Sequence, residues 1–361
     1  MISLKRWDSQ MLKKKIITMA LISVSLVCLL SGCGSSASKS STETSGTEKI
    51  AATSTDNSSA SQSKGPNGGG MTGGGGAVDK SNDKELQTMI TDVKDKFKQF
   101  EYKDPDTGKT VAYNLYIPDN YDSSKSYPLV LFIADSSVVG KDTTAPLTQG
   151  YGGLIWATKE EQAKHESFVL VPEYPETILD DHGSFTMTDY VEMTPRLLNS
   201  VTSSYNIDKN RLYGTGQSMG CMTIMYLSAQ HPDLFTAEFF VSGQWDISKL
   251  GNLASQKYFY IAAEGDDKAS AGQIEVETML KSAGAKYSAA TNWDATWSAD
   301  KFSPAVKSIL SEGNNINIAT FKKGTVLPEG TPAGTSEHMY SFDYAYKIEG
   351  IRDWLFSQTK K

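Results

Sequence analysis

Apolar and polar residues alternate along 110–118 (TVAYNLYIP), a pattern typical of a half-exposed strand. Turn residues fill the stretch just before it, 104–109 (DPDTGK), so the sequence predicts an early antiparallel hairpin. Continuous apolar runs bounded by turn residues follow, and such runs are typical of strands buried on both faces. The strands predicted after the hairpin occupy 127–135, 167–175, 210–216, 237–245, 257–265 and 315–324.

Stretches with helical spacing of apolar residues separate several of these strands. The predicted helices cover 189–205, which Pro195 interrupts near its start, 219–231, 273–284 and 344–358. Residues 148–157 (TQGYGGLIWA) are predicted as a loop. Strands that alternate with helices indicate an α/β fold, in which a mostly parallel sheet is covered by helices on both faces and is preceded here by the hairpin.

The first 32 residues have the pattern of an export signal. Lys13–Lys15 is basic, and residues 16–30 form an apolar run that is too short to span a bilayer. The run ends in LSGC (30–33), which resembles a bacterial lipobox and implies cleavage before Cys33 and a lipid on its sulfur. We therefore predict a signal peptide at 1–32 and a lipoprotein on the extracellular side of the cell membrane. The alternative is an ordinary signal peptide with an incidental cysteine.

Composition divides the rest of the chain into two parts. Residues 33–84 are rich in Ser, Thr and Gly and contain no aromatic residue, so they bury too little apolar surface to fold and are predicted to be a disordered tether. Residues 85–361 are sufficient for one large α/β domain. The net charge of −7 and the lack of a basic stripe argue against nucleic-acid binding, and the membrane is expected to be contacted only through the lipid.

The cysteines predict neither a disulfide nor a metal site. Cys28 lies within the signal, Cys33 is the lipidation candidate, and Cys221 is the third cysteine of the chain. The mature chain would therefore have no intrachain disulfide, and no C-x-x-C or paired-histidine motif indicates a metal.

The pentapeptide Gly216-Gln217-Ser218-Met219-Gly220 lies between a predicted strand and a predicted helix. This is the context of a nucleophile elbow, in which the serine of G-x-S-x-G occupies a strained turn at the end of a strand. The two glycines remove side chains that would collide with the neighbouring backbone. The Met219 N–H begins the helix, where it is placed to donate to an oxyanion. Ser218 is therefore the candidate nucleophile.

A serine nucleophile needs an adjacent base, and histidine is the expected one. In hydrolases with this elbow, the histidine follows both the nucleophile and the acid along the chain. His165 and His182 precede Ser218, and His231 lies at the end of the helix that leaves the elbow, where we expect it to cap that helix. His338, between the last strand and the last helix, remains as the candidate base.

The acid is expected after a strand that follows the elbow. Glu264, Asp266 and Asp267 lie at the carboxyl end of the strand predicted at 257–265, where α/β sheets place their sites. A carboxylate there would accept the Nδ1–H of His338 and fix its tautomer. We prefer Asp266, with Asp267 as the alternative acid and Glu264 third, although Gly-Asp-Asp is also ordinary turn chemistry.

Residues 97–358 resemble the α/β-hydrolase superfamily, and within it the secreted esterases related to polyhydroxybutyrate depolymerases and feruloyl esterases. The segments that carry the resemblance are YPLVLFIAD, FVLVPEYP, NIDKNRLYGTGQSMGCM, HPDLFTAEFFVSGQWD, AAEGDDKA and EHMYSFDYAYKIEGIRDWLF. The resemblance implies a Ser218–Asp266–His338 triad and an acyl-enzyme mechanism that needs no metal or organic cofactor.

One stretch departs from the family pattern. Many relatives carry His-Gly-x-Gly after the first long buried strand, where it supplies the second oxyanion donor, whereas this chain has Ala134-Asp135-Ser136-Ser137. We expect the backbone N–H of Ser136 or Ser137 to be that donor, and the Asp135 carboxylate to point away from the oxyanion. Cys221 replaces a second glycine after the elbow and is expected to be a small buried residue.

Trp245 and Gln217 are the candidate substrate-binding residues. Trp245 follows a strand that neighbours the elbow, although a core tryptophan would fit the same pattern. Tyr151 and Trp156 are weaker candidates within the loop predicted at 148–157.

Together these observations predict a lipid-anchored serine hydrolase that cleaves carboxylic esters of small molecules or polysaccharides through an acyl-enzyme on Ser218. A peptidase of the prolyl-oligopeptidase type would use the same triad, but the sequence suggests no propeller domain. A non-catalytic glycan-binding lipoprotein on a hydrolase scaffold would explain the altered oxyanion stretch. An acyltransferase would use the same acyl-enzyme.

Overall fold

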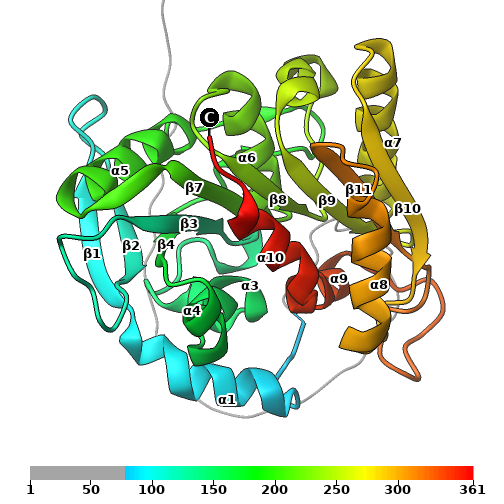
Figure 1. Cartoon of the computed structure of the whole chain (residues 1–361), viewed down its shortest axis with the longest axis horizontal. Helices are drawn as coiled ribbons and strands as arrows, with labels where there is room; N and C mark the ends of the chain where they lie inside the picture. The colour runs from blue at the N-terminus through cyan, green and yellow to red at the C-terminus, as the bar shows by residue number, and fades with distance from the viewer. Residues whose placement is uncertain (1–77, 361) are drawn as a thin grey trace, which may run out of the picture. The chain divides into compact units, whose positions relative to one another are not determined.

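The computed structural model describes residues 78–360, which form a nine-stranded sheet in the order β1-β2-β4-β3-β7-β8-β9-β11-β10 (Figure 1). From β4 to β10 every neighbouring pair is parallel, whereas β2 is antiparallel to both β1 and β4. The strands are β1 Lys98–Lys103, β2 Thr110–Tyr116, β3 Tyr127–Ile133, β4 Phe168–Glu173, β7 Ile207–Gln217, β8 Ala237–Val241, β9 Tyr258–Ala263, β10 Tyr287–Trp293 and β11 Ile316–Phe321. The predicted α/β class, with a mostly parallel sheet and an N-terminal hairpin, is confirmed.

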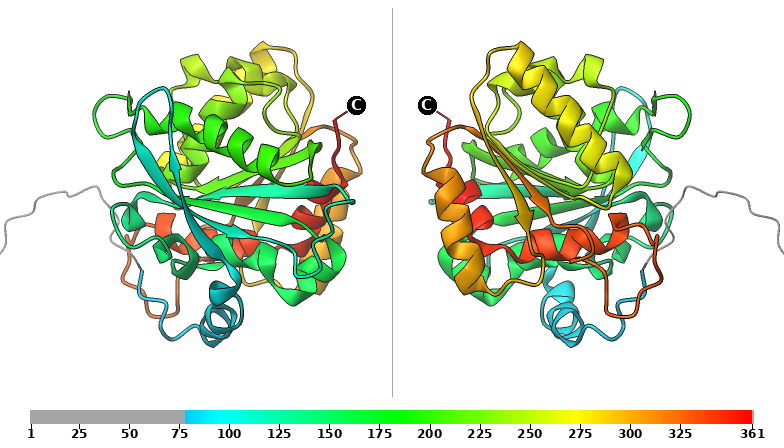
Figure 2. Two further views of the ribbon diagram at one scale, coloured as in Figure 1. Left: turned by 90° about the vertical axis from the view of Figure 1, so that its left-hand side faces the viewer. Right: turned by 90° about the vertical axis from the view of Figure 1, so that its right-hand side faces the viewer.

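Helices cover both faces of the sheet, as Figure 2 shows. One core lies under α5, α6 and α7, and a second core on the opposite face lies under α1, α3, α8, α9 and α10. In β3, β4, β8 and β9 every side chain is buried between these two layers, which explains their continuous apolar runs. The helices are α1 Lys84–Val93, α2 Ala145–Thr148, α3 Tyr151–Leu154, α4 Lys159–Lys164, α5 Tyr190–Ser204, α6 Met219–Gln230, α7 Asp267–Ser282, α8 Ala299–Leu310, α9 His338–Lys347 and α10 Glu349–Ser357.

Several helix predictions need correction. The helix predicted at 189–205 continues through Pro195, because its buried residues pack as one face against the sheet. The single helix predicted at 344–358 is two helices, α9 and α10, because Ile348 between them is extended. The loop predicted at 148–157 is instead a chain of short helices whose residues are mostly buried. Within 78–360, no helix is both long and apolar enough to cross a bilayer.

The two outer strands of the sheet differ in character. β1 reads KQFEYK, with exposed Lys98, Glu101 and Lys103. β10, at the other edge, was not predicted, and its pairing with β11 shifts register between Ala290 and Trp293. A small antiparallel hairpin, β5 Leu179–Asp180 and β6 Thr186–Met187, forms a separate two-stranded sheet.

The segment before α1 lies against the folded unit. Lys80 forms an ion pair with Asp343 of α9 at 2.6 Å, and the Asp83 side chain caps α1 by accepting the N–H of Leu86 at 3.0 Å. Residues 78–83, which the composition places in the tether, are therefore attached to the domain. The predicted signal peptide, the lipidation site at Cys33 and the rest of the tether lie outside the described residues.

Candidate active site

The carboxyl ends of four parallel strands bring the predicted site residues to one edge of the sheet. Ser218 directly follows β7, Asp266 follows β9, and His338 follows the loop that leaves β11. The stretch that begins at Asp135 follows β3, the neighbour of β7. Parallel strands place their ligand sites at this edge, because all their outgoing loops converge there.

The elbow holds Ser218 in a strained backbone conformation, with φ 51° and ψ −118°. Its N–H donates to the carbonyl of Val241 at 3.1 Å, which ties the turn to β8. A Cβ on Gly220 would overlap the Ile133 carbonyl, and one on Gly216 would overlap the backbone of Gly220. Both glycines are therefore required by close backbone approach rather than by turn geometry.

Three side chains form a hydrogen-bonded chain. The Ser218 Oγ lies 2.8 Å from Nε2 of His338, and Nδ1 of the same ring lies 2.6 Å from Oδ2 of Asp266. Asp266 is only 2% exposed, and its Oδ1 accepts the N–H of Ala269 at 3.2 Å as the cap of α7. This second bond orients the carboxylate, so that its other oxygen faces the imidazole.

The other two acid candidates face elsewhere. Asp267 is exposed as the first residue of α7, and Glu264 is exposed and accepts the N–H of Lys323 at 3.1 Å. Of the three carboxylates proposed from sequence, the structure brings Asp266 to His338.

Two backbone donors proposed for the oxyanion lie at the same cavity as Ser218. Met219 is the first residue of α6, so its N–H is one of the helix's free N-terminal donors. Ser136 begins a short 3₁₀ turn, Ser136–Val138, and lies exposed at the cavity wall. Both N–H groups therefore lie at the wall of the cavity that contains Ser218, and at Met219 the dipole of α6 favours negative charge.

The Asp135 carboxylate is occupied by internal contacts. Its Oδ1 accepts the N–H of Ser137 at 2.8 Å, and its Oδ2 accepts Nε2 of Gln217 at 2.9 Å. Gln217 also donates to Gln149 at 3.0 Å, and Gln149 donates to the Ser137 hydroxyl at 2.9 Å. Three side-chain hydrogen bonds and the Ser137 N–H thus close a ring around this stretch.

Neither candidate substrate-binding residue lines the cavity that contains Ser218. Gln217 is 1% exposed and belongs to the ring just described. Trp245 is 3% exposed and packs in the core, where its ring meets the edge of Phe185 at 5.0 Å between centroids. Tyr151 and Trp156 are completely buried on the opposite face of the sheet.

The remaining predicted residues have structural surroundings. His231 caps α6 as predicted, and its Nε2 lies 2.9 Å from Glu192. His165 stacks on Phe356 with 4.4 Å between ring centroids. Cys221 is fully buried, and burial raises the pKa of its thiol, which therefore stays protonated.

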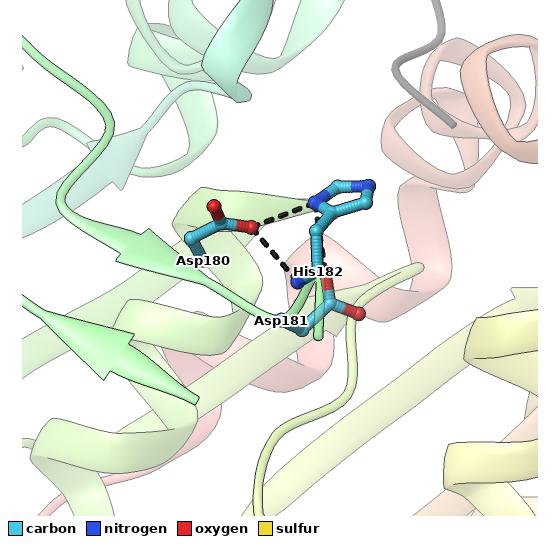
Figure 3. A group of neighbouring side chains, drawn as sticks. All are labelled: Asp180, Asp181 and His182. Carbon is cyan, nitrogen blue, oxygen red and sulfur yellow. Dashed lines mark hydrogen bonds and ion pairs between the residues drawn. The ribbon is translucent and has the colours of Figure 1, made fainter. Parts of the chain in front are cut away.

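Three potential metal ligands gather at the turn of the β5–β6 hairpin (Figure 3): Asp180, Asp181 and His182. The Asp180 carboxylate faces the His182 ring at 2.7 Å from Nδ1. Asp181 accepts from Gln244 and from the Lys268 ammonium, the latter at 2.9 Å. Lys268 already neutralises Asp181, and of the three residues only His182 is exposed. The contacts of the group therefore form an ion-paired rim of the cavity.

The cavity beside Ser218 has a volume of about 1100 Å³. Its wall combines apolar side chains with charged ones, among them Leu179, Met222, Leu327, Lys268 and Lys323. This volume is large for a small-molecule site, which usually measures about 300–1,000 Å³.

Sequence reasoning missed two polar residues beside the triad. Gln149 belongs to the ring around Asp135, and it lies in a segment that was predicted as a loop. Glu337 directly precedes His338 and is 2% exposed. Adjacency to the histidine was the signal available for Glu337, because glutamate in a polar loop is ordinarily solvated.

No protein-family model matches the chain, and no curated protein matches its sequence significantly. Among solved structures, it is similar to a thermostable esterase, at 25% identity and a TM-score of 0.58, over 74% of this chain and 64% of that one. A putative dipeptidyl aminopeptidase IV from Bacteroides ovatus is more distant, at 12% identity and a TM-score of 0.47, over 73% of this chain and 36% of that one. A feruloyl esterase module from Clostridium thermocellum matches at 13% identity and a TM-score of 0.45, over 71% of this chain and 89% of that one.

The chain therefore spans slightly less than two thirds of the length of the thermostable esterase. Three observations indicate the same fold: the strand order, the elbow between β7 and α6, and this structural similarity. The chain has an α/β-hydrolase fold, structurally like that of an esterase.

Proposed function

We propose that this protein is a serine hydrolase that cleaves carboxylic esters through an acyl-enzyme on Ser218. The observation that carries the proposal is the hydrogen-bonded chain from Ser218 through His338 to the buried Asp266, placed at the wall of a large cavity. A serine hydroxyl is a weak nucleophile, and this arrangement supplies the adjacent base and the carboxylate that orients it.

In the proposed reaction, Ser218 Oγ attacks the ester carbonyl while its proton passes to Nε2 of His338. The resulting imidazolium returns that proton to the leaving alcohol as the ester C–O bond breaks, which leaves the acyl group on Ser218. Water then adds to the acyl carbonyl with His338 again taking a proton, and the carboxylic acid is released as the serine regains its hydrogen.

The negative charge on the carbonyl oxygen would be held by the backbone N–H groups of Met219 and Ser136. Met219 supplies a free helix N-terminal donor, and the ring around Asp135 fixes the stretch that contains Ser136. Because Asp135 is engaged with Ser137 and Gln217, its charge is directed away from the developing oxyanion.

The cavity suggests an ester with both apolar and polar parts. Leu179, Asp180 and His182 of the β5–β6 hairpin line its wall, and the same hairpin carries two large exposed apolar side chains, Phe185 and Met187. An ester with one apolar and one polar part would match the mixed lining of this wall. We propose small-molecule or polysaccharide esters as the substrate class.

The test compares full-length protein with Ser218→Ala on p-nitrophenyl acetate, p-nitrophenyl butyrate and a fluorophosphonate probe. Ser203→Ala is the control, because Ser203 is an exposed serine on α5. We expect turnover and labelling by the wild type and by Ser203→Ala, and neither by Ser218→Ala. A folded wild type that neither labels nor hydrolyses would overturn the proposal and favour a glycan-binding protein on this scaffold.

We also propose that the protein is a lipoprotein of the cell membrane that faces the extracellular side. The support is the sequence alone: a basic segment, an apolar run and the LSGC motif at 30–33. Mass spectrometry of the mature N-terminus tests this proposal, with Cys33→Ala as the comparison. A released, unlipidated wild-type product would contradict it.

A further inference from the structure

Glu337 is a buried carboxylate one residue before the proposed base. It is 2% exposed, although it belongs to the loop that runs from β11 to α9. Among residues 78–360, no lysine, arginine or histidine nitrogen lies within ion-pairing distance of its carboxylate. A buried carboxylate without a cationic partner is costly unless other donors satisfy it.

Two backbone amides satisfy this carboxylate, one from the loop after β9 and one from the start of its own loop. Its Oε2 accepts the N–H of Gly265 at 3.1 Å, and its Oε1 accepts the N–H of Gly324 at 2.5 Å. Gly265 follows β9 and precedes Asp266, whereas Gly324 follows β11. One side chain therefore joins the loop of the proposed acid to the start of the loop that leads from β11 to the proposed base.

The fit around this contact is close. A Cβ on Gly265 would overlap the Glu337 carboxyl group, so the glycine is needed for the carboxylate to approach its backbone. The Glu337 N–H also donates to the Gly265 carbonyl at 3.4 Å. Glu337 and Gly265 thus form reciprocal hydrogen bonds, and the next residue of each chain segment is a member of the triad.

On the basis of the proposed function, we infer that Glu337 is a positioning residue for the His338–Asp266 pair. His338 and Asp266 must keep their 2.6 Å contact while Nε2 stays 2.8 Å from Ser218. Charge-assisted hydrogen bonds to Glu337 fix the spacing of the two loops that carry them. A displacement of about 1 Å at such a site costs about 100-fold in rate.

A second contact, which does not involve Glu337, holds the backbone of His338. The Ser341 hydroxyl donates to the His338 carbonyl at 2.8 Å and lies 2.7 Å from the hydroxyl of buried Ser242, which follows β8. This contact and the packing of α9 keep the start of the helix in place. We therefore expect Glu337 variants to fold, with an altered His338–Asp266 geometry.

The experiment uses full-length protein with Glu337→Gln and Glu337→Ala. Glutamine keeps one acceptor oxygen but presents an NH₂ group to the second backbone N–H, so it retains one of the two hydrogen bonds. We expect kcat for p-nitrophenyl butyrate to fall about tenfold in Glu337→Gln and about 100-fold in Glu337→Ala. Although Glu337 lies at the cavity wall, its carboxylate is engaged with backbone N–H groups, so KM should stay within about twofold of the wild type.

Glu238→Gln is the matched control. Glu238 is an equally buried glutamate, but it lies near the amino end of β8, away from the edge that carries the triad. We expect its kcat to equal that of the wild type. A purely structural Glu337 would lower the melting temperature while kcat per labelled active site stayed unchanged, and that result would overturn the inference.

A spectroscopic readout separates this inference from the proposed function. A proton in a short histidine–aspartate hydrogen bond gives a far-downfield resonance, which His338→Ala would assign by its loss. The inference expects this resonance in the wild type and in Glu238→Gln, and its loss or shift in Glu337→Ala. An inactive wild type with this pattern would refute the esterase proposal alone, whereas an unchanged resonance in Glu337→Ala would refute the positioning role.

Discussion

Replacing Asp266 with asparagine tests the proposed triad at its acid. The carboxylate is 2% exposed and lies 2.6 Å from Nδ1 of His338. In the proposed reaction His338 becomes an imidazolium, and the negative charge of Asp266 stabilises it. The asparagine side chain would keep the size of the group but remove that charge. The neighbouring Asp267→Asn removes the same charge from an exposed position and is the matched control.

The size of the effect follows from the geometry. Two unit charges about 4 Å apart in a partly buried site, with an effective dielectric constant of about 20, attract by about 4 kcal/mol. Since about 1.36 kcal/mol corresponds to a tenfold change in rate, losing this attraction slows acylation about 1,000-fold. An asparagine amide facing Nδ1 also favours the wrong tautomer, which brings the expected loss towards about 10,000-fold.

The assay is steady-state hydrolysis of p-nitrophenyl butyrate, with active sites counted by fluorophosphonate labelling after long incubation. We expect Asp266→Asn to lose at least about 1,000-fold in kcat and Asp267→Asn to stay within about twofold of the wild type. A large loss in Asp267→Asn with little loss in Asp266→Asn would refute the reasoning, since the exposed carboxylate would then be the acid. Equal activity in both variants would mean that neither carboxylate orients His338.

Two further predictions concern the scaffold. Gly220→Ala places a methyl group on the Ile133 carbonyl, so we expect stability to fall by about 1–3 kcal/mol and Ser218 to be labelled more slowly. Thermal unfolding and the rate of probe labelling measure the two effects. Gly251→Ala is the control, because a methyl group there meets open space and should change neither quantity. Burial raises the pKa of Glu238 to about 8, so the folded chain keeps a proton that the unfolded chain releases near the ordinary pKa of glutamate. Wild-type stability should therefore fall as the pH rises from about 5 to about 8. The Glu238→Gln variant should lack that part of the fall. Denaturant unfolding at both pH values measures the difference, on the order of 5 kcal/mol at full ionisation. Parallel curves for the two proteins would contradict the prediction.

Buried strands were the most predictable part of the fold. Their apolar runs, such as 127–135 and 257–265, have one physical cause, which is burial between two helix layers. The edge strand β10 escaped prediction because it is half exposed and reads YSAATNW, with small polar residues and no apolar run. The loop predicted at 148–157 is wrong because the segment packs into the core: Gly152 and Gly153 are buried against Phe132, where a larger residue would not fit.

The placement of the candidate site followed from chain order and strand ends. Ser218 and His338 could be selected because the elbow lies between a strand and a helix and because the other histidines occupy the wrong places in the chain. The choice among Glu264, Asp266 and Asp267 needed the structure, because the three carboxylates lie within four residues and differ only in their three-dimensional contacts. Gln149 and Glu337 act across long sequence separations, which no local pattern encodes.

The contrast between β1 and β10 bears on how the protein behaves when it is concentrated. An exposed sheet edge offers unpaired backbone groups to a second chain and so invites aggregation. The lysines of β1 oppose such pairing because a second strand would have to bury or approach their charges. At the other edge, the register shift of β10 and the positive φ of 62° at Asn292 interrupt the straight ladder that a partner strand needs. The two ends of the sheet are thus protected by different means, one by charge and one by shape.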